Sequence, residues 1–282
     1  MQNIDINDIF NQTSSKIKTI SVTSGKGGVG KSNIVVNLAI QLARMGKRVL
    51  IIDADFGLAN IDILLNLQPV HTIEEFLNSS TNLESIIMRG PLGIHIIPSA
   101  SGIPEMADMT LRQQKFLIDA LSKLQSRYDY MIIDTGAGIS PNVLRFNASV
   151  DDVLIVTNTE PTSLTDAYAI MKILSTKYRL TKFTLIVNNC TVEGGKKIYT
   201  LLSGVARNHE HLFRLEFGGS LPTDLTIQSS IKARVAHSLM FPNSKLTMAF
   251  ERLAKNLAMN ISASSSENNA TFWNRFLKWK AV

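Results

Sequence analysis

Cysteine is almost absent from this chain of 282 residues, which has only Cys190. A single thiol cannot form an internal disulfide or a Cys-x-x-Cys metal clip, so the sequence favours a reducing compartment, the cytoplasm. The absence of clustered cysteines also excludes an iron–sulfur centre held by this chain. Because Cys190 adjoins an apolar run, we expect it to lie in the core.

Long apolar runs and a leader pattern are absent as well. No stretch approaches the roughly 18 apolar residues that a spanning helix needs, and residues 1–16 do not lead from a basic segment into an apolar one. We therefore expect neither an integral membrane protein nor one exported by a cleaved signal. Acidic residues are fewer than basic ones, and the formal net charge of +6 favours acidic partners: a nucleotide, a nucleic acid or an anionic lipid surface.

The apolar residues are arranged in short β-branched runs that alternate with helical patterns. This alternation predicts an α/β fold with a doubly wound, mostly parallel sheet, whose strands are covered on both faces. The clearest predicted strands are residues 19–23, 48–53, 94–98, 130–134, 153–157 and 184–188. The clearest predicted helices are residues 32–45, 113–126 and 163–178.

Composition divides the chain into one domain and short extensions. We predict one large α/β domain at residues 17–260, an N-terminal extension at 1–16, a flexible linker at 261–270 and an amphipathic helix at 271–282. The linker is rich in serine and asparagine and is too polar to pack. In the extension, four apolar residues can form a short docking element, although a frayed terminus fits the pattern as well: Ile4, Ile6, Ile9 and Phe10.

A phosphate-binding loop is the strongest signal in the sequence. Residues 25–32 fit the pattern G-x-x-x-x-G-K-[ST] and stand between a predicted strand and a predicted helix. Glycines let backbone N–H groups surround phosphates, Lys31 adds positive charge, and the Ser32 hydroxyl can bind Mg²⁺. We therefore predict ATP and Mg²⁺ as cofactors. The predicted nucleotide-binding residues here are Gly25, Lys26, Gly27, Gly28, Val29, Gly30, Lys31, Ser32 and Asn33.

A second lysine gives this loop a more specific character. Because Lys26 is followed by Gly27 and Gly28, the loop resembles that of the deviant Walker A, or MinD/ParA, family of ATPases. The resemblance implies that Lys26 reaches the nucleotide of a partner subunit, so that ATP joins two chains into a homodimer. It also implies that Lys26 and Lys31 share catalytic roles with a carboxylate. The alternative is that Lys26 is a solvated loop lysine.

Two other segments place carboxylates at the ends of predicted strands. By the same resemblance, Asp55 orients the attacking water and Asp53 supports the magnesium shell, while Asp55 and Gly57 belong to a first switch. In the segment 130–138, Asp134 is the Walker B carboxylate that binds magnesium together with Ser32. The second switch, Gly136 and Gly138, can sense the γ-phosphate. The alternative for the first segment is that its aspartates cap a turn.

The adenine contacts are predicted from the family pattern alone. Asn188 follows a predicted strand where the family uses an asparagine for the adenine edge. Pro222 and Asp224 lie in a segment that resembles the loop flanking the base. An asparagine at a strand end is otherwise an ordinary turn residue.

Within the family, three stretches resemble the FlhG group of flagellar number regulators: residues 30–33, 160–168 and 188–195. The resemblance implies slow regulatory hydrolysis of ATP and flagellar assembly partners, including an FlhF-like GTPase and basal-body components. It does not extend to residues 1–16, which lack the Asp-Gln-Ala-x-x-Leu-Arg segment that stimulates the GTPase. Residues 163–166 also fit a capping box, whose only role is to start a helix.

The tail has the pattern of a helix that lies in a lipid interface. On a helical projection its aromatic and apolar residues gather on one side, with Arg275 and Lys278 opposite. We predict reversible, peripheral binding to the inner face of the cytoplasmic membrane. The alternative is that the tail packs on its own domain. The predicted membrane-binding residues are Phe272, Trp273, Phe276, Leu277 and Trp279.

Two rival functions share the same ATPase motifs. One is placement of the division site, as in MinD, which differs only in its partners. The other is nonspecific DNA binding, as in ParA, which the net positive charge permits and which salt weakens through counterion release. Nucleic acid is the less favoured partner, because DNA binding does not require the aromatic tail.

Overall fold

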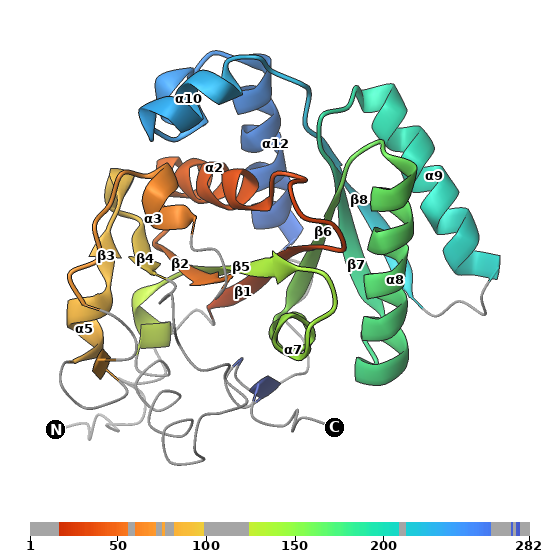
Figure 1. Ribbon diagram of the computed structural model, residues 1–282, viewed down its shortest axis with the longest axis horizontal. Coiled ribbons are helices and arrows are strands. Elements are labelled where there is room, and N and C mark those ends of the chain that lie inside the picture. Colours follow the sequence, from red (N-terminus) through yellow and green to blue (C-terminus); the bar gives the residue numbers. More distant parts are fainter. Residues whose placement is uncertain are drawn as a thin grey trace, which may run out of the picture.

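The protein is described by a computed structural model that covers residues 17–55, 60–71, 75–76, 82–98, 124–208 and 213–260, together with residues 272, 275 and 276. Over these residues the chain forms one sheet with helices on both faces (Figure 1). This arrangement confirms the predicted α/β class with a doubly wound, mostly parallel sheet.

The sheet has the strand order β3-β4-β2-β5-β1-β6-β7-β8. Neighbouring strands are parallel, except that β3 pairs with β4 in the antiparallel direction. The strands are β1 (Lys18–Ser24), β2 (Val49–Ala54), β3 (Met88–Arg89), β4 (His95–Ile97), β5 (Tyr130–Ala137), β6 (Asp152–Thr157), β7 (Lys182–Val187) and β8 (Arg214–Ser220).

The structure confirms all the predicted strands to within a few residues and adds the two edge strands β3 and β8. β3 is too short to show the alternation of apolar and polar residues that marks a strand. β8 is interrupted by Gly218 and Gly219, whose lack of side chains weakens the alternation that marks a strand.

The helices confirm the predictions at residues 32–45 and 163–178. The predicted helix 113–126 lies almost wholly outside the described residues. The described helices are α2 (Lys31–Arg44), α3 (Ile61–Leu64), α5 (Leu83–Ile86), α7 (Pro141–Ser149), α8 (Pro161–Tyr178), α9 (Val192–Asn208), α10 (Ile227–Ala233), α11 (His237–Met240) and α12 (Lys245–Asn260), with 3₁₀ turns η1 (Pro91–Gly93) and η2 (Gln125–Arg127).

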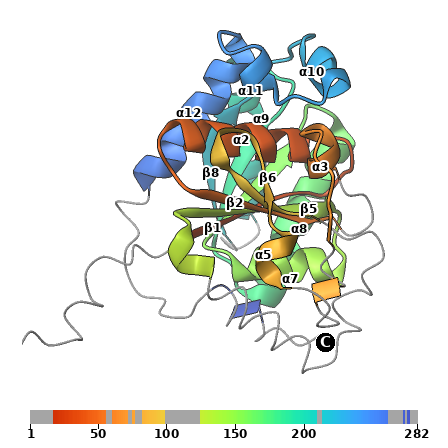
Figure 2. The ribbon, with the colours of Figure 1, turned by 90° about the vertical axis from the view of Figure 1, so that its left-hand side faces the viewer.

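Each face of the sheet has its own hydrophobic cluster. One face packs against α2 and α12 and includes Leu38 and Phe250. The other packs against α7, α8 and α9 and includes Phe146 and Ile170. Figure 2 shows α2 and α12 above the sheet and α7 below it. Cys190 is buried in the second cluster, as its sequence surroundings predict.

The position of β1 determines where a ligand can bind. β1 lies between β5 and β6, where the connections change direction from one half of the sheet to the other. In open parallel sheets, ligands bind outside the carboxyl ends of the strands at such a point. The segments that follow β1, β2 and β5 meet there, and these are the segments that carry the predicted site residues.

Candidate functional site

The loop after β1 has the geometry that a phosphate-binding loop requires. It connects Ser24, the last residue of β1, to Lys31, the first residue of α2. Gly30 precedes the helix with a φ of 95°, and an added Cβ there would lie 2.5 Å from the Asn188 side-chain nitrogen. A side chain at this position is therefore excluded both by backbone conformation and by space. The loop ends at a helix N-terminus, which attracts anions.

Lys31 and Asp134 form the buried centre of the site. Lys31 is 8% exposed, and burial lowers the pKa of its ammonium while the charges of Asp134 and Asp55 oppose this change. Asp134 is 1% exposed, and burial raises its pKa to about 7, with the nearby Ser32 hydroxyl and Lys31 acting in the opposite direction. Among the described residues, neither carboxylate oxygen of Asp134 has a hydrogen-bond partner.

These oxygens fit a magnesium ion. A buried carboxylate without partners is costly, and Mg²⁺ prefers oxygen ligands such as Asp134 and Ser32. The described residues contain no group of three or more histidine, cysteine or acidic side chains that could hold a metal. Such a site suits Mg²⁺, which is usually bound by one or two protein ligands and by substrate phosphates.

Asp53 organises the chain around the predicted first switch. It faces Asp134 in the register of β2 and β5. Its Oδ1 accepts a hydrogen bond from the Asp55 amide at 3.1 Å, and its Oδ2 accepts from the amides of Asn60 and Ile61 at 3.1 and 3.3 Å. Burial raises the pKa of Asp53 to about 6, although these three amides lower it. The structure therefore gives Asp53 the turn-holding role of the alternative interpretation, and its magnesium role stays a prediction. Gly57 lies outside the described residues.

The two switch segments are adjacent. An added Cβ at Gly136 would lie 3.3 Å from Oδ1 of Asp55. The Gly138 amide donates a hydrogen bond to the Ser24 carbonyl at 2.9 Å, which joins the second switch to the start of the phosphate loop. The structure thus brings Asp55, Gly136 and Gly138 together beside the loop, as their predicted roles require.

Lys26, in the phosphate loop, contacts the start of α8. Its ammonium donates hydrogen bonds to the carboxylate of Glu160 and, at 3.1 Å, to the hydroxyl of Thr162. Glu160 immediately precedes α8 and Thr162 is in its first turn. Residues 160–168, which resemble the FlhG group, thus also contact Lys26, a contact that their sequence does not predict. The two segments are far apart in sequence, so no local pattern could have shown the contact.

Glycine also allows the loop to rest on α8. An added Cβ at Gly25 would lie 2.4 Å from the backbone carbonyl of Asp166. The capping-box interpretation of residues 163–166 is wrong, because α8 already begins at Pro161. The Ser163 hydroxyl instead bonds the Thr157 hydroxyl at 2.8 Å and accepts from the Asn158 amide at 3.3 Å. Ser163 therefore attaches α8 to the end of β6.

The predicted adenine residues lie near the loop with different partners. Asn188 donates a hydrogen bond from its side chain to the Val29 carbonyl at 2.8 Å. Asp224 accepts from the Thr226 amide at 2.9 Å and from the Thr226 hydroxyl, and its second oxygen is 3.7 Å from His237 Nε2. Asp224 thus holds its own loop, which begins at Pro222. Direct contact of these residues with adenine stays a prediction.

The described tail residues are buried, in contrast to the exposed face expected of a membrane helix. Phe272 and Phe276 are 2% and 4% exposed, and the Phe276 ring lies 4.8 Å from that of Phe146 in α7. Arg275 donates a hydrogen bond to Asp151 at 2.8 Å. This packing on the domain is the alternative that the sequence left open. The predicted membrane residues Trp273, Leu277 and Trp279, and the linker, lie outside the described residues.

Known proteins resemble this chain in sequence and in fold. A protein-family profile described as AAA domain matches residues 17–186. The chain is 37% identical over 240 residues to the antiactivator FleN of Pseudomonas aeruginosa. The aligned region covers 85% of each protein. The chain belongs to the MinD/ParA family of P-loop ATPases. It is also 30% identical over 283 residues to the flagellum site-determining protein YlxH of Helicobacter pylori, covering 99% of this ATPase and 96% of YlxH.

A solved structure confirms the fold of this ATPase. The septum site-determining protein MinD of Pyrococcus horikoshii, complexed with Mg-ADP, superposes with a TM-score of 0.69 at 23% identity. The match covers 89% of this ATPase and 100% of that chain. The nucleotide there belongs to that protein.

Proposed function

We propose that this ATPase is a slow regulatory switch, in which ATP and Mg²⁺ join two chains and the dimer controls flagellar number and placement at the membrane. The likeness to FleN and to the flagellum site-determining protein YlxH supports the flagellar part. The position of Lys26 carries the dimer part. This lysine lies outside the phosphate cradle of its own chain, where a second nucleotide can meet it.

The residues of one chain divide the chemistry among them. The loop amides and the N-terminus of α2 hold the phosphates, and Lys31 places a positive charge beside them. Ser32 and Asp134 would hold Mg²⁺, which would neutralise charge on the phosphates. Asp55 orients the attacking water. Positioning and charge supply most of the catalysis in phosphoryl transfer.

Lys26 must leave Glu160 before it can reach a partner's nucleotide. The side chains of this pair are 39% and 55% exposed. Exposed ion pairs contribute only about 0–1 kcal/mol, so the triphosphate of a second chain can compete for the lysine. The contact then favours the monomer without preventing the dimer.

Membrane contact requires the tail to leave α7. With Phe272 and Phe276 buried, the apolar face is not available to lipid in this state. α7 begins at Pro141, three residues after Gly138 of the second switch. A change of that switch on ATP binding can therefore displace the surface on which the tail rests. Two tails on one dimer would then bind a membrane together, which raises their combined affinity.

The test is a size measurement of Asp55→Ala, which should bind ATP without hydrolysing it. With ATP and magnesium the variant should elute as a dimer and sediment with anionic liposomes, and without ATP it should remain monomeric and soluble. A monomer at all concentrations with saturating ATP would rule out the switch. The parent should hydrolyse ATP slowly, and a parent without turnover would leave only a nucleotide-binding scaffold.

Placement of the division site is the second candidate, favoured by the shared fold of MinD. The two candidates differ in partners: flagellar basal-body components and an FlhF-like GTPase for the first, septum proteins for the second. Deletion of the gene separates them, because excess flagella would follow in the first case and minicells in the second. DNA binding would persist after removal of residues 271–282, whereas liposome binding would not.

A further inference from the structure

The outer edge of β8 lies between two hollows. The hollow on the α9 side has a volume of about 310 Å³ and is lined by Tyr199, Ser203, Ala206, Arg207, Phe213, Arg214 and Leu215. The hollow on the α12 side has about 200 Å³. Within the described part of the chain, β8 is the last strand of its sheet. Such an edge presents unpaired backbone groups that can bind another strand.

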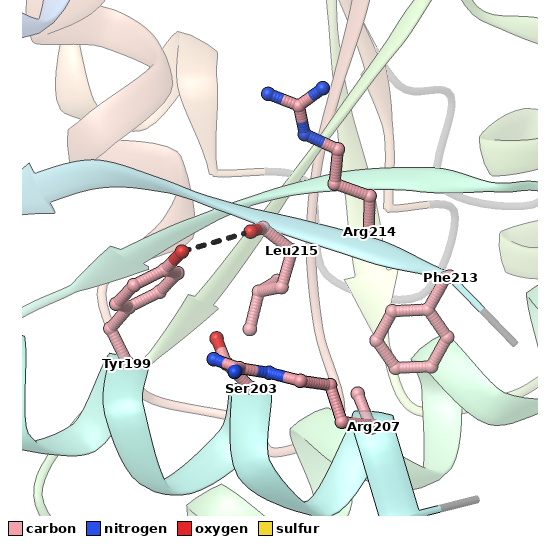
Figure 3. A pocket seen from close by; sticks show the side chains of 7 residues that line it. Tyr199, Ser203, Arg207, Phe213, Arg214 and Leu215 are labelled. Atoms are coloured by element: carbon pink, nitrogen blue, oxygen red, sulfur yellow. Dashed lines mark hydrogen bonds between the residues drawn. The ribbon is translucent and has the colours of Figure 1, made fainter. Parts of the chain in front are cut away.

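The backbone of β8 shows which groups face outward. The Arg214 amide donates to the Thr181 carbonyl at 2.7 Å, so Arg214 faces β7. Because successive residues of a strand alternate, the amide and carbonyl of Leu215 face the open edge. In agreement, the Tyr199 hydroxyl donates to the Leu215 carbonyl at 3.3 Å (Figure 3). Figure 3 also shows Phe213 and Leu215 directed toward α9, whereas Arg214 points the other way.

The surroundings of this edge are positively charged. Arg207 is exposed and has no ion pair among the described residues. The side chain of Arg214 is 78% exposed and shares Glu216 with Lys182, at 3.2 and 3.0 Å. Two cations therefore share one carboxylate, and Arg207 adds a further positive charge on the α9 side. Ser203 adds a buried hydroxyl without a hydrogen-bond partner beside the hollow. The edge suits an extended segment with apolar and acidic side chains.

The N-terminal extension of this chain has that composition. Residues 3–8 read Asn-Ile-Asp-Ile-Asn-Asp, in which Ile4 and Ile6 alternate with Asp5 and Asn7. A period of two suits a strand with one apolar face. From β1 to a strand beyond β8 is four strand spacings, about 19 Å. Residues 9–16 can span about 26 Å when extended, which is enough.

We propose that residues 3–8 add to β8 of their own chain as an outermost antiparallel strand. The chain enters from the amino end of β1, near the amino end of β8, so the added segment runs backward along β8. Ile6 occupies the hollow on the α9 side. Asp8 shares a face with Ile6 and lies beside Arg207 near the start of β8. The added strand covers the open edge and keeps the extension on the molecule.

Engineered disulfides test the placement. In the full chain with Cys190→Ala, the pair Ile6→Cys and Ser203→Cys should form a disulfide within one chain upon mild oxidation. Thr200→Cys with Ile6→Cys is the matched control, because Thr200 is an exposed residue of the same helix that does not line the hollow. Mass spectrometry of the linked peptides identifies the bond. Equal yields for the two pairs, or a bond between two chains, would overturn the proposal.

Hydrogen exchange of the Leu215 and Phe217 amides gives an independent measurement. In the full chain, Arg207→Glu should reduce their protection by about tenfold, and Asp8→Arg in the same protein should restore it. Amides of β1 serve as the internal control and should not change. Restoration by the exchanged charges cannot arise from general destabilisation. If both variants exchange like the parent, or if the second change restores nothing, Asp8 does not lie beside Arg207.

Discussion

The two buried carboxylates of the site differ in how their charge is compensated. Asp53 is bonded by three amides, whereas the oxygens of Asp134 have no hydrogen-bond partner among the described residues. Both are strand-end carboxylates in one register, and the sequence alone did not distinguish them. The difference comes from the chain after β2, which turns back over Asp53. Asp134 is therefore the residue whose ionisation depends most on bound cations.

The pH dependence of stability follows from Asp134. Its pKa in the folded chain is about 7, against about 3.9 for an unfolded aspartate. The folded chain thus retains a proton that the unfolded chain releases, so the nucleotide-free protein loses stability as pH rises from about 4 to about 7. Asp134→Asn should remove most of this loss, which between pH 5 and pH 8 is on the order of 3 kcal/mol. Urea unfolding at pH 5 and pH 8 measures it.

The control for this experiment is Glu193→Gln, which neutralises an exposed carboxylate of α9. This variant should keep the pH dependence of the parent. Burial also raises the pKa of Asp53, to about 6. Asp53 should therefore leave a smaller dependence of stability on pH in both the parent and Asp134→Asn. An unchanged slope in Asp134→Asn would show that Asp134 is already ionised in the folded chain.

Glu160 provides a prediction about dimer formation. Glu160→Gln removes the charge that holds Lys26 and should raise the fraction of dimer at a given ATP concentration several-fold. The free energy of unfolding should stay close to that of the parent, because the pair is exposed. Sedimentation velocity measures the dimer fraction. The matched control Glu251→Gln breaks an exposed pair with Lys255 on α12. An equal response in both variants would contradict the role of Glu160.

Among the elements, the phosphate loop and α8 are in close backbone contact. Gly25→Ala would place a methyl group 2.4 Å from the Asp166 backbone, so either the loop or the helix must shift. We expect a loss of about 2 kcal/mol in stability and a clear loss of ATP affinity. Thermal unfolding and nucleotide titration measure these effects.

Gly27→Ala is the comparison for this variant, because an added Cβ there has no atom within 4 Å. Its stability should remain close to that of the parent. Equal stabilities for Gly25→Ala and Gly27→Ala would show that the contact with α8 is not tight.

The contact between the tail and the start of β6 predicts a change in liposome binding. Asp151 accepts from Arg275 and also from the amide and hydroxyl of Thr19. Asp151→Asn weakens the tail contact but leaves the tail sequence intact, so it should raise sedimentation with anionic liposomes in the absence of ATP. Asp152→Asn is the control, because Asp152 pairs with Lys18 instead. No difference between these variants would argue against a role of Asp151 in holding the tail.

How closely a strand or helix can be predicted from the sequence depends on what surrounds it in the fold. Strands buried on both faces, such as β1 and β5, are continuous apolar runs and were predicted closely. The contact between Lys26 and Glu160 joins residues that become neighbours only through the parallel order of β1 and β6. The burial of Phe276 depends on α7 in the same way. An apolar period in the sequence indicates that a helix has an apolar face. It does not indicate whether lipid or protein covers that face.

At the scale of the whole molecule, Phe272 and Phe276 of the tail are part of the packed core. Removal of residues 272–282 deletes two buried phenylalanines and should lower the free energy of unfolding by about 2–4 kcal/mol. The loss of stability cannot exceed the free energy with which the tail docks on the domain, because the rest of the chain stays folded when the tail detaches. The double variant Phe272→Ala and Phe276→Ala should show a similar loss. Urea unfolding of full-length and shortened chains decides, and equal stabilities would mean that the tail does not dock.

Asn147 has a consequence for how a signal crosses the molecule. Its side chain bonds Ser21 at 2.6 Å, Thr23 at 3.2 Å and the Val143 carbonyl at 2.8 Å, all in the core. A buried amide whose bonds are all made has no second arrangement of equal energy. Asn147 therefore joins strand β1 to helix α7, so that a change in the position of β1 should move α7 as a whole rather than unfold it.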